Sequence, residues 1–398
     1  LFDKGKVREH QKAMASRVEK LARPARTLPE WEKEKYIQEG HTVYDFTIGS
    51  PNIAPSKEVQ EALIQAAMDP KSYMYALHDS KELKATVKDW YQKRYHVELD
   101  EQREILALQG SQEGLAHIAL AVCDEGDVVL IPAPSYPIFA NGPRIAGAEV
   151  YEMPMLEEYD YQIQLQDIPE DIARRAKMMI VSYPNNPTGA IATDTFFEEL
   201  VAFAKHYDIL VLHDMAYSEL VFDGGKAKSF LAYPGAKEVG IEFNSFSKNY
   251  GMAGARIGLC VGNKEAVRCL RKLKSNIDYG MFLPIQKAAV AALTQDQSIL
   301  EETRNTYQRR RNRMIEGFKE AGWTIQAPKG TMFIWAKIPK GYDSEGFAIA
   351  LLKKTGILVT PGNAFGRYGE GYVRIALVQS DEVIEAAIAS LKKSAMFV

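Results

Sequence analysis

The chain has 398 residues, of which 46% are hydrophobic and 25% charged, a globular composition whose length suggests two or three domains around a sizeable core. A formal net charge of −3 gives no electrostatic reason to expect nucleic acid as a partner. The cysteines Cys123, Cys260 and Cys269 form no disulfide framework and no metal-binding spacing, and no apolar run reaches membrane-spanning length, so we expect a cytoplasmic protein without a metal site.

Short β-branched runs alternate with amphipathic stretches from residue 105 onward. Before them, the polar N-terminal segment contains a predicted helix at 11–21. The predicted strands are 105–108, 128–131, 178–181, 209–212 and 239–243. Helices are predicted between them, for example at 112–123 and 195–206. This alternation is typical of an α/β sheet.

The pattern changes after a densely charged helical segment at 301–313. The elements predicted beyond it are strands at 331–338 and 372–378 and helices at 345–354 and 381–393. We therefore expect a large α/β domain over 46–291 and a smaller, discontinuous α+β domain made of 1–45 and 292–398.

Lys248 lies between small residues after the last predicted strand of the large domain. Most lysines in such loops are simply solvated. Here, however, the hydroxyls of Ser245 and Ser247 and the guanidinium of Arg256 could together bind one phosphate. The segment 245–258 resembles the lysine-attachment signature of class I and II aminotransferases and matches it at every constrained position.

This resemblance implies a fold type I enzyme, with a mostly parallel sheet flanked by helices in the large domain. It also implies that Lys248 holds pyridoxal 5'-phosphate as a Schiff base and moves a proton between the substrate α-carbon and the cofactor. The expected reaction transfers an amino group between an L-amino acid and a 2-oxo acid.

Asp214 ends a predicted strand, where a buried carboxylate would keep the cofactor's ring nitrogen protonated. Without Lys248 in the sequence, turn capping would be the simpler interpretation of Asp214. Tyr217 resembles the family's tyrosine that hydrogen-bonds the cofactor's phenolic oxygen, with core packing as the alternative. His213 points to the opposite face of the strand and is interpreted as structural.

Asn186 follows the predicted strand 178–181 in a turn that matches the family's Asn-Pro-x-Gly pattern. The resemblance makes Asn186 a donor to the phenolic oxygen and implies a cis bond to Pro187. Tyr136, after the strand 128–131, resembles the aromatic residue that stacks on the cofactor ring, although core filling is an alternative.

Gly110, Ser111 and Gln112 join a predicted strand to a predicted helix. The glycine allows a close backbone approach, and a helix N-terminus favours an anion, so this loop is a candidate phosphate contact. A simple N-cap is equally compatible with the pattern.

Arg374 is an isolated arginine on an otherwise apolar predicted strand, where burial without an anion would be costly. The family uses an arginine at this place to bind the substrate α-carboxylate through two hydrogen bonds. Gly49 matches the family's N-terminal glycine near the same carboxylate, and Asn186 is included among the substrate contacts.

The resemblance also implies a homodimer in which a tyrosine from one subunit reaches the phosphate of its neighbour. Tyr73 and Tyr75 are both candidates, because ungapped spacing falls on Met74 between them.

The substrate stays open between alanine, aspartate, aromatic amino acids and LL-diaminopimelate. The segment 275–284 resembles the branch that contains LL-diaminopimelate aminotransferases, and Asp278 in it could meet a distal ammonium or cap a helix. A carbon–sulfur β-lyase with the same cofactor is the alternative enzyme. A regulatory protein is less favoured, because such regulators carry an added helix-turn-helix domain for which the N-terminal segment leaves no room.

Overall fold

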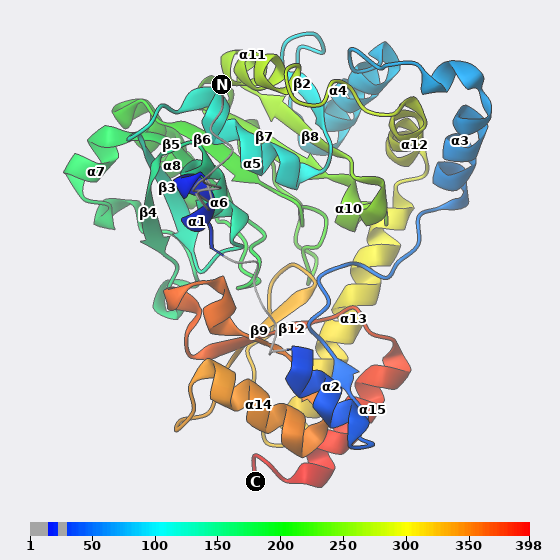
Figure 1. Cartoon of the computed structure of the whole chain (residues 1–398), viewed down its shortest axis with the longest axis vertical. Coiled ribbons are helices and arrows are strands. Elements are labelled where there is room, and N and C mark those ends of the chain that lie inside the picture. Colours follow the sequence, from blue (N-terminus) through cyan, green and yellow to red (C-terminus); the bar gives the residue numbers. More distant parts are fainter. Residues whose placement is uncertain (1–14, 23–29) are drawn as a thin grey trace, which may run out of the picture.

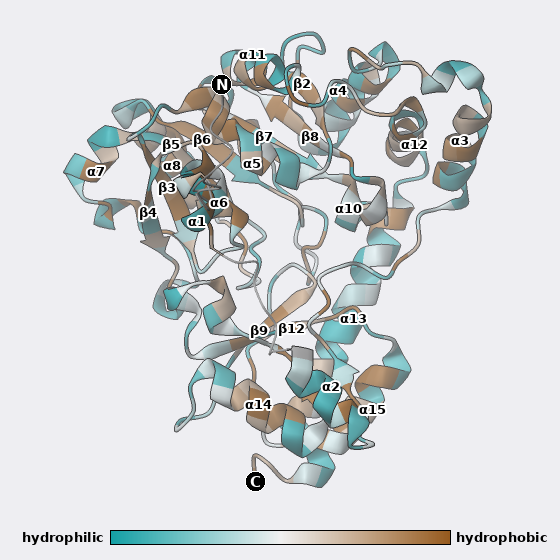
Figure 2. Cartoon of the chain, viewed as in Figure 1, coloured by the Kyte–Doolittle hydropathy of each residue, from teal (hydrophilic) through white to brown (hydrophobic). Residues whose placement is uncertain are grey.

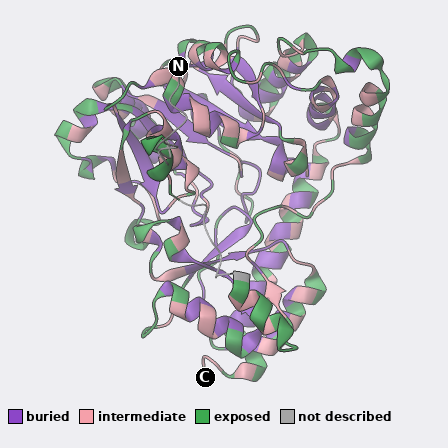
Figure 3. Cartoon of the chain, viewed as in Figure 1, coloured by how far each residue is buried: buried purple, intermediate pink, exposed green. Residues whose placement is uncertain are grey.

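The structure is a computed structural model that describes residues 15–22 and 30–398. It has two parts, which are joined along one side by the long helix α13 (Ser298–Glu320) (Figure 1). Strand segments in both parts are apolar and buried, whereas the outer faces of the surrounding helices are polar and exposed (Figures 2 and 3). No helix in the described part of the chain is long and apolar enough to cross a membrane.

A seven-stranded sheet forms the centre of the larger part. Its strands, in spatial order, are β2 (Ile105–Leu108), β8 (Gly258–Gly262), β7 (Gly240–Ser245), β6 (Leu210–Asp214), β5 (Ala176–Ser182), β3 (Val128–Ala133) and β4 (Glu149–Pro154). Only β8 runs antiparallel to its neighbours. The other six strands therefore end at the same edge of the sheet, where α/β proteins place their ligands.

Helices cover both faces of this sheet and bury alternate residues of each strand. One face packs against α5 (Ser111–Val122), α6 (Ile138–Ile145) and α11 (Lys264–Lys274). The other packs against α4 (Lys81–Tyr95), α7 (Glu170–Arg175), α8 (Asp194–Tyr207) and α12 (Leu283–Thr294). Three further helices of this part are α3 (Lys57–Met68), α9 (Ala236–Val239) and α10 (Phe246–Asn249).

The five strands predicted in this part are confirmed, but β4 and β8 were missed. β4 is an edge strand whose residues are mostly half-exposed, so it has no apolar run. β8 is a short strand bounded by glycine at both ends, and it begins at Gly258, the last residue of the lysine motif. In each case the usual pattern of a buried strand is absent.

The smaller part has its own sheet and core. β9 (Phe333–Lys337), β12 (Tyr372–Ala376) and β11 (Thr360–Pro361) form an antiparallel sheet, and β1 (Tyr44–Asp45) pairs in parallel with β10 (Ile357–Leu358). The helices around it are α2 (Glu30–Gln38), α13, α14 (Ser344–Thr355) and α15 (Asp381–Ser394). The predicted elements of the C-terminal segment are thus confirmed.

The two parts have separate hydrophobic cores, and we propose for them the predicted domain boundaries of 46–291 for the large domain and 1–45 with 292–398 for the small one. The predicted helix 11–21 begins outside the described residues, and its described portion is α1 (Ser16–Glu19). Just after α1, the backbone N–H of Ala22 donates to Asn141 of α6, so this segment contacts the large part.

The loop after β6 is anchored by a buried carboxylate. Glu219 accepts hydrogen bonds from Arg94 and Tyr95 of α4, and its side chain is only 1% exposed. This ion pair fixes the segment that carries Tyr217.

We predict that Arg94→Met lowers the free energy of unfolding by about 3 kcal/mol or more, because Glu219 would be left as an uncompensated buried charge. Arg174→Met is the matched control, since Arg174 pairs with Glu170 at the surface and should contribute less than about 1 kcal/mol. Urea unfolding of both variants measures the difference. Equal shifts for the two variants would contradict the anchoring role of Glu219.

Candidate active site

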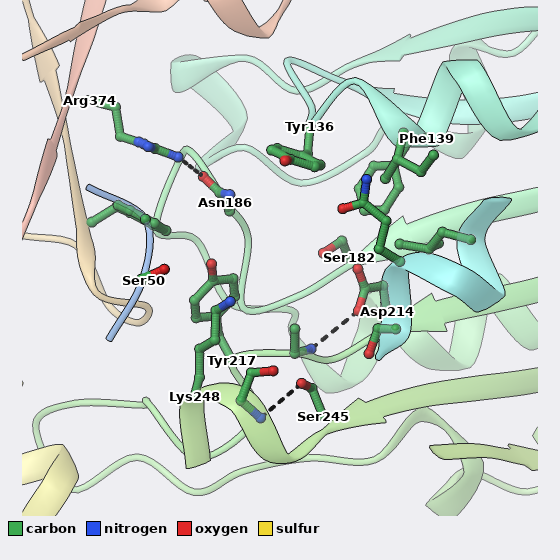
Figure 4. Close-up of a pocket in the computed structure, with 18 of the residues that line it drawn as sticks. Ser50, Tyr136, Phe139, Ser182, Asn186, Asp214, Tyr217, Ser245, Lys248 and Arg374 are labelled. Carbon is green, nitrogen blue, oxygen red and sulfur yellow. Dashed lines mark hydrogen bonds between the residues drawn. The ribbon is translucent and has the colours of Figure 1, made fainter. Parts of the chain in front are cut away.

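A cavity of about 420 Å³ lies between the carboxyl ends of the parallel strands and the small three-stranded sheet. Figure 4 shows the side chains that converge on it from β6, β5, β7, α10 and β12. Of the residues predicted from sequence, those that line it are Gly49, Ser111, Gln112, Tyr136, Asn186, Asp214, Tyr217, Ser245, Ser247, Lys248, Arg256 and Arg374. The fold thus brings together residues that are up to 325 positions apart, from Gly49 to Arg374.

One end of the cavity is suited to an anion with several oxygens. The Oγ of Ser111, at the start of α5, is buried and has no hydrogen-bond partner in the described part of the chain. Gly110 precedes it with φ 81°, and a Cβ there would lie 2.5 Å from Nη2 of Arg256. Because residue 110 has no side chain, the Arg256 guanidinium can lie against its backbone, beside the N-terminus of α5. The backbone N–H groups of this helix end also favour an anion.

The middle of the cavity holds a buried acid and a buried amine. Asp214 is 7% exposed, and its Oδ1 accepts a hydrogen bond of 3.3 Å from the backbone N–H of Ala216. Burial raises the pKa of Asp214 to about 6, against the opposing effects of His213, the Ala216 N–H and Lys248. Burial also lowers the pKa of Lys248, which Asp214 opposes.

Aromatic rings border this acid and amine. The Nζ of Lys248 lies 5.7 Å from the centre of the Tyr217 ring, and Tyr136 lines the same space. Burial raises the pKa of Tyr217 above its usual range, so its hydroxyl remains a hydrogen-bond donor at neutral pH.

At the other end, Arg374 of β12 is buried between two aromatic rings. The centres of the Phe333 and Phe365 rings lie 4.0 and 4.9 Å from its Cζ. Its Nη1 donates to Oδ1 of Asn186 and its Nη2 to the carbonyl of Thr47, each at 3.2 Å. Burial lowers the pKa of Arg374 to about 10, and no carboxylate of the described chain pairs with it. Arg374 is therefore available to an anionic ligand.

These groups fit pyridoxal phosphate, the cofactor that the resemblance implies. The orphaned Ser111 hydroxyl and Arg256 suit its phosphate, and Asp214 suits a protonated ring nitrogen. Lys248 lines the same cavity as these groups and Arg374, and Figure 4 shows its side chain in one view with those of Asp214 and Arg374. The Nδ2 of Asn186 stays available to donate, because only its Oδ1 is used by Arg374. The Asn186–Pro187 bond is cis, as expected.

Several lining residues were missed from sequence. Thr360 is opposite Arg374 in the β11–β12 register, and its buried Oγ1 has no partner among the described residues. Ser182 is opposite Asp214 in the β5–β6 register and could have been found from its place at a strand end. Others are Thr47, Ser50, Phe139 and Phe333.

Tyr73 and Tyr75 do not reach this chain's own cavity. They are 66% and 86% exposed and lie beside Phe282 and Tyr279. Their expected contact with a neighbouring subunit stays a prediction. Asp278 accepts a hydrogen bond from Lys274 at 2.8 Å, so in this chain it meets a lysine of its own helix region.

The raised pKa of Asp214 predicts a stability effect in the cofactor-free protein. The ionised carboxylate costs no free energy below pH about 4, where the folded and unfolded forms are both protonated, and its full cost is reached above pH about 6. Asp214→Asn removes this cost, so the variant should be more stable than the wild type by about 2 to 3 kcal/mol at pH 8 and no more stable at pH 4. Unfolding measured at both pH values tests this, and a less stable variant at pH 8 would contradict it.

The sequence and the fold both match known proteins. The family described as aminotransferase class I and II matches residues 41–391. LL-diaminopimelate aminotransferase of Moorella thermoacetica is 44% identical over 389 residues, which cover 98% of this chain and 97% of that protein. Glutamate-pyruvate aminotransferase AlaC of Escherichia coli is 43% identical over 90% of this chain and 87% of that protein.

Two solved structures extend this similarity to three dimensions. Substrate-bound BacF from Bacillus subtilis superposes with a TM-score of 0.89 at 33% identity, covering 96% of this chain and 98% of that one. A probable N-succinyldiaminopimelate aminotransferase from Thermus thermophilus has a TM-score of 0.87 at 36% identity, covering 92% of this chain and 98% of that one. The resemblance seen around Lys248 is thereby confirmed, and the chain belongs to the class I and II aminotransferases, enzymes that use pyridoxal 5'-phosphate.

Proposed function

We propose that the cavity at the carboxyl edge of the sheet is the active site of this aminotransferase and that Lys248 is the lysine that carries its cofactor. The observation that supports this most strongly is that Lys248, Asp214 and Arg374 line one cavity, where the charges of Asp214 and Arg374 both act on the pKa of the Lys248 amine. The amine thus shares one cavity with a carboxylate that suits the cofactor ring and a guanidinium that suits the substrate carboxylate.

When bound, pyridoxal phosphate supplies an electron sink for the substrate's α-carbon. Asp214 holds the proton on the ring nitrogen, because a carboxylate in this buried site strongly favours a cationic partner. Lys248 moves a proton between the substrate α-carbon and the cofactor, and its lowered pKa favours this task. Arg374 orients the α-carboxylate through its planar fork.

The substrate class is an α-amino acid with its 2-oxo acid partner. Among the described residues that line the cavity, the arginines are Arg256 and Arg374, one for each anionic end. LL-diaminopimelate is the first donor to test and alanine and glutamate the next, because related proteins carry these names.

Amino-transfer kinetics test the two central residues. Lys248→Ala should lower kcat by at least about 100-fold, because the proton-transferring amine is lost. Arg374→Lys should raise KM for every donor by about tenfold or more, because a lysine cannot reproduce the two-pronged contact. Lys264→Ala and Arg309→Lys, at exposed positions, are the matched controls and should leave kinetics unchanged. A donor-selective effect of Arg374→Lys would contradict the shared α-carboxylate role.

We further propose a cytoplasmic homodimer. Two neighbouring segments, 68–77 and 277–282, carry exposed apolar side chains and are joined by a 2.7 Å hydrogen bond from the N–H of Gly280 to the carbonyl of Ala76. The exposed side chains are Met68, Tyr73, Met74, Tyr75, Leu77, Ile277, Tyr279 and Phe282. Apolar clusters of this kind usually mark protein–protein interfaces, and this one would carry Tyr73 or Tyr75 toward the partner's phosphate. The three free cysteines suit a reducing compartment.

The double variant Met74→Asp with Leu77→Asp should be monomeric, because it introduces charge into the proposed interface. Leu156→Asp is the control, since Leu156 is 37% exposed and lies outside the two segments. Light scattering after size-exclusion chromatography gives the mass of each species. If the double variant is still a dimer, these two segments do not form the interface.

A further inference from the structure

His213 lies directly before Asp214 on β6, but on the other face of the sheet. Val211 and Met215 pack in the core on that face, whereas Leu212 packs in the core on the opposite face. The His213 side chain is fully buried, and the rings of Phe197 and Phe230 border it. It therefore does not line the cavity that contains Asp214.

Both ring nitrogens of His213 face hydrogen-bond acceptors. Nδ1 lies 2.9 Å from Oε2 of Glu242, its partner in the β6–β7 register, and Nε2 lies 2.9 Å from the carbonyl oxygen of Tyr183 at the end of β5. A neutral imidazole has only one N–H to donate. In that form one nitrogen of this fully buried ring would turn a lone pair toward an acceptor, so the doubly protonated ring is the form that satisfies both contacts.

Glu242 accepts hydrogen bonds from every side. Besides His213, Oε1 accepts from Tyr91 of α4 at 3.0 Å and from Ser229 at 2.6 Å, and Oε2 accepts from the N–H of Phe230 at 2.8 Å. Burial and Glu242 raise the pKa of Tyr91 well above its usual range, so Tyr91 stays a neutral donor. With four donors on its two oxygens, Glu242 needs no proton of its own. The charged groups that face His213 and Asp214 are therefore Glu242 on the His213 side of the sheet and Lys248 on the cavity side.

We propose that His213 is a positioning residue, held as an imidazolium by Glu242 and Tyr183, which keeps Asp214 ionised from behind the sheet. His213 does not touch the cavity; its positive charge lowers the free energy of the carboxylate on the adjacent residue. In agreement, His213 is the foremost of the influences that oppose the effect of burial on the pKa of Asp214. The inference rests on the proposed role of Asp214 at the cofactor's ring nitrogen.

The protonation state can be observed without any variant. In protein labelled with ¹⁵N at its seven histidines, NMR should show both nitrogens of the buried His213 protonated at pH 8, with and without cofactor. Exposed histidines are mostly neutral at that pH. A neutral His213 tautomer at pH 8 would overturn the proposal.

The action on Asp214 is measured through cofactor affinity. Pyridoxal phosphate is titrated into the cofactor-free protein between pH 5 and 8, and affinity should fall as Asp214 becomes protonated. In His213→Gln the pKa of Asp214 should be higher. The pH at which cofactor affinity falls should therefore rise by about one unit, and near pH 5.5 the variant should bind the cofactor about tenfold more weakly than the wild type. Phe197→Leu is the control, because it disturbs the packing around His213 and removes no charge. It should leave the pH of the fall unchanged.

Comparison with Asp214→Asn separates this inference from the proposed function. If Asp214 acts as proposed, Asp214→Asn weakens cofactor binding, and adding His213→Gln to it weakens binding no further. The role of His213 would be overturned if His213→Gln left the pH at which cofactor affinity falls unchanged, or if Phe197→Leu shifted that pH equally. Either result would count even where Asp214→Asn weakens cofactor binding. A doubly protonated His213 together with normal cofactor binding by Asp214→Asn would instead overturn the proposed role of Asp214.

Discussion

Burial of charge at the carboxyl edge of the seven-stranded sheet is the constraint on which the rest of this structure depends. Desolvation raises the pKa of Asp214 to about 6 and lowers the pKa of Lys248 and of Arg374. The pKa of each group therefore differs from the value that the group would have in water. A bound cofactor and substrate would place opposite charges directly against Asp214 and Arg374, which makes the cavity more favourable when filled than when empty.

The fold maintains this arrangement through buried contacts outside the cavity. Glu219 and Arg94 tie the loop after β6 to α4, and Glu242 ties β7 to the far face of β6 through His213. Thr47 and Asn186 hold the Arg374 guanidinium from two different segments. The cavity residues can therefore be polar and partly unpartnered while their backbone segments stay fixed.

Much of this could be predicted from the sequence, and the exceptions have physical reasons. Strands such as β2 and β5 are buried along nearly their whole length and appear as apolar runs, whereas the half-exposed β4 does not. Lys248 could be recognised from its flanking Ser245, Ser247 and Arg256 and from the family motif that they form. Asp214 could be recognised from its strand end only in view of Lys248, and Arg374 because an unpaired arginine on an apolar strand is costly to bury. Thr360 could not be recognised from the sequence, because its position in the cavity depends on the pairing of β11 with β12. The partnership of His213 with Glu242 likewise depends on a register between strands that the sequence does not reveal.

Identification of the lysine that binds the cofactor tests the central claim most directly. Borohydride reduction of the cofactor-loaded enzyme, followed by peptide mass mapping, fixes the cofactor to its lysine and reports the position. We expect the added mass on the peptide that contains Lys248, and on that peptide alone. The same mass on another lysine, with Lys248 unmodified in active enzyme, would contradict the assignment of this cavity as the active site.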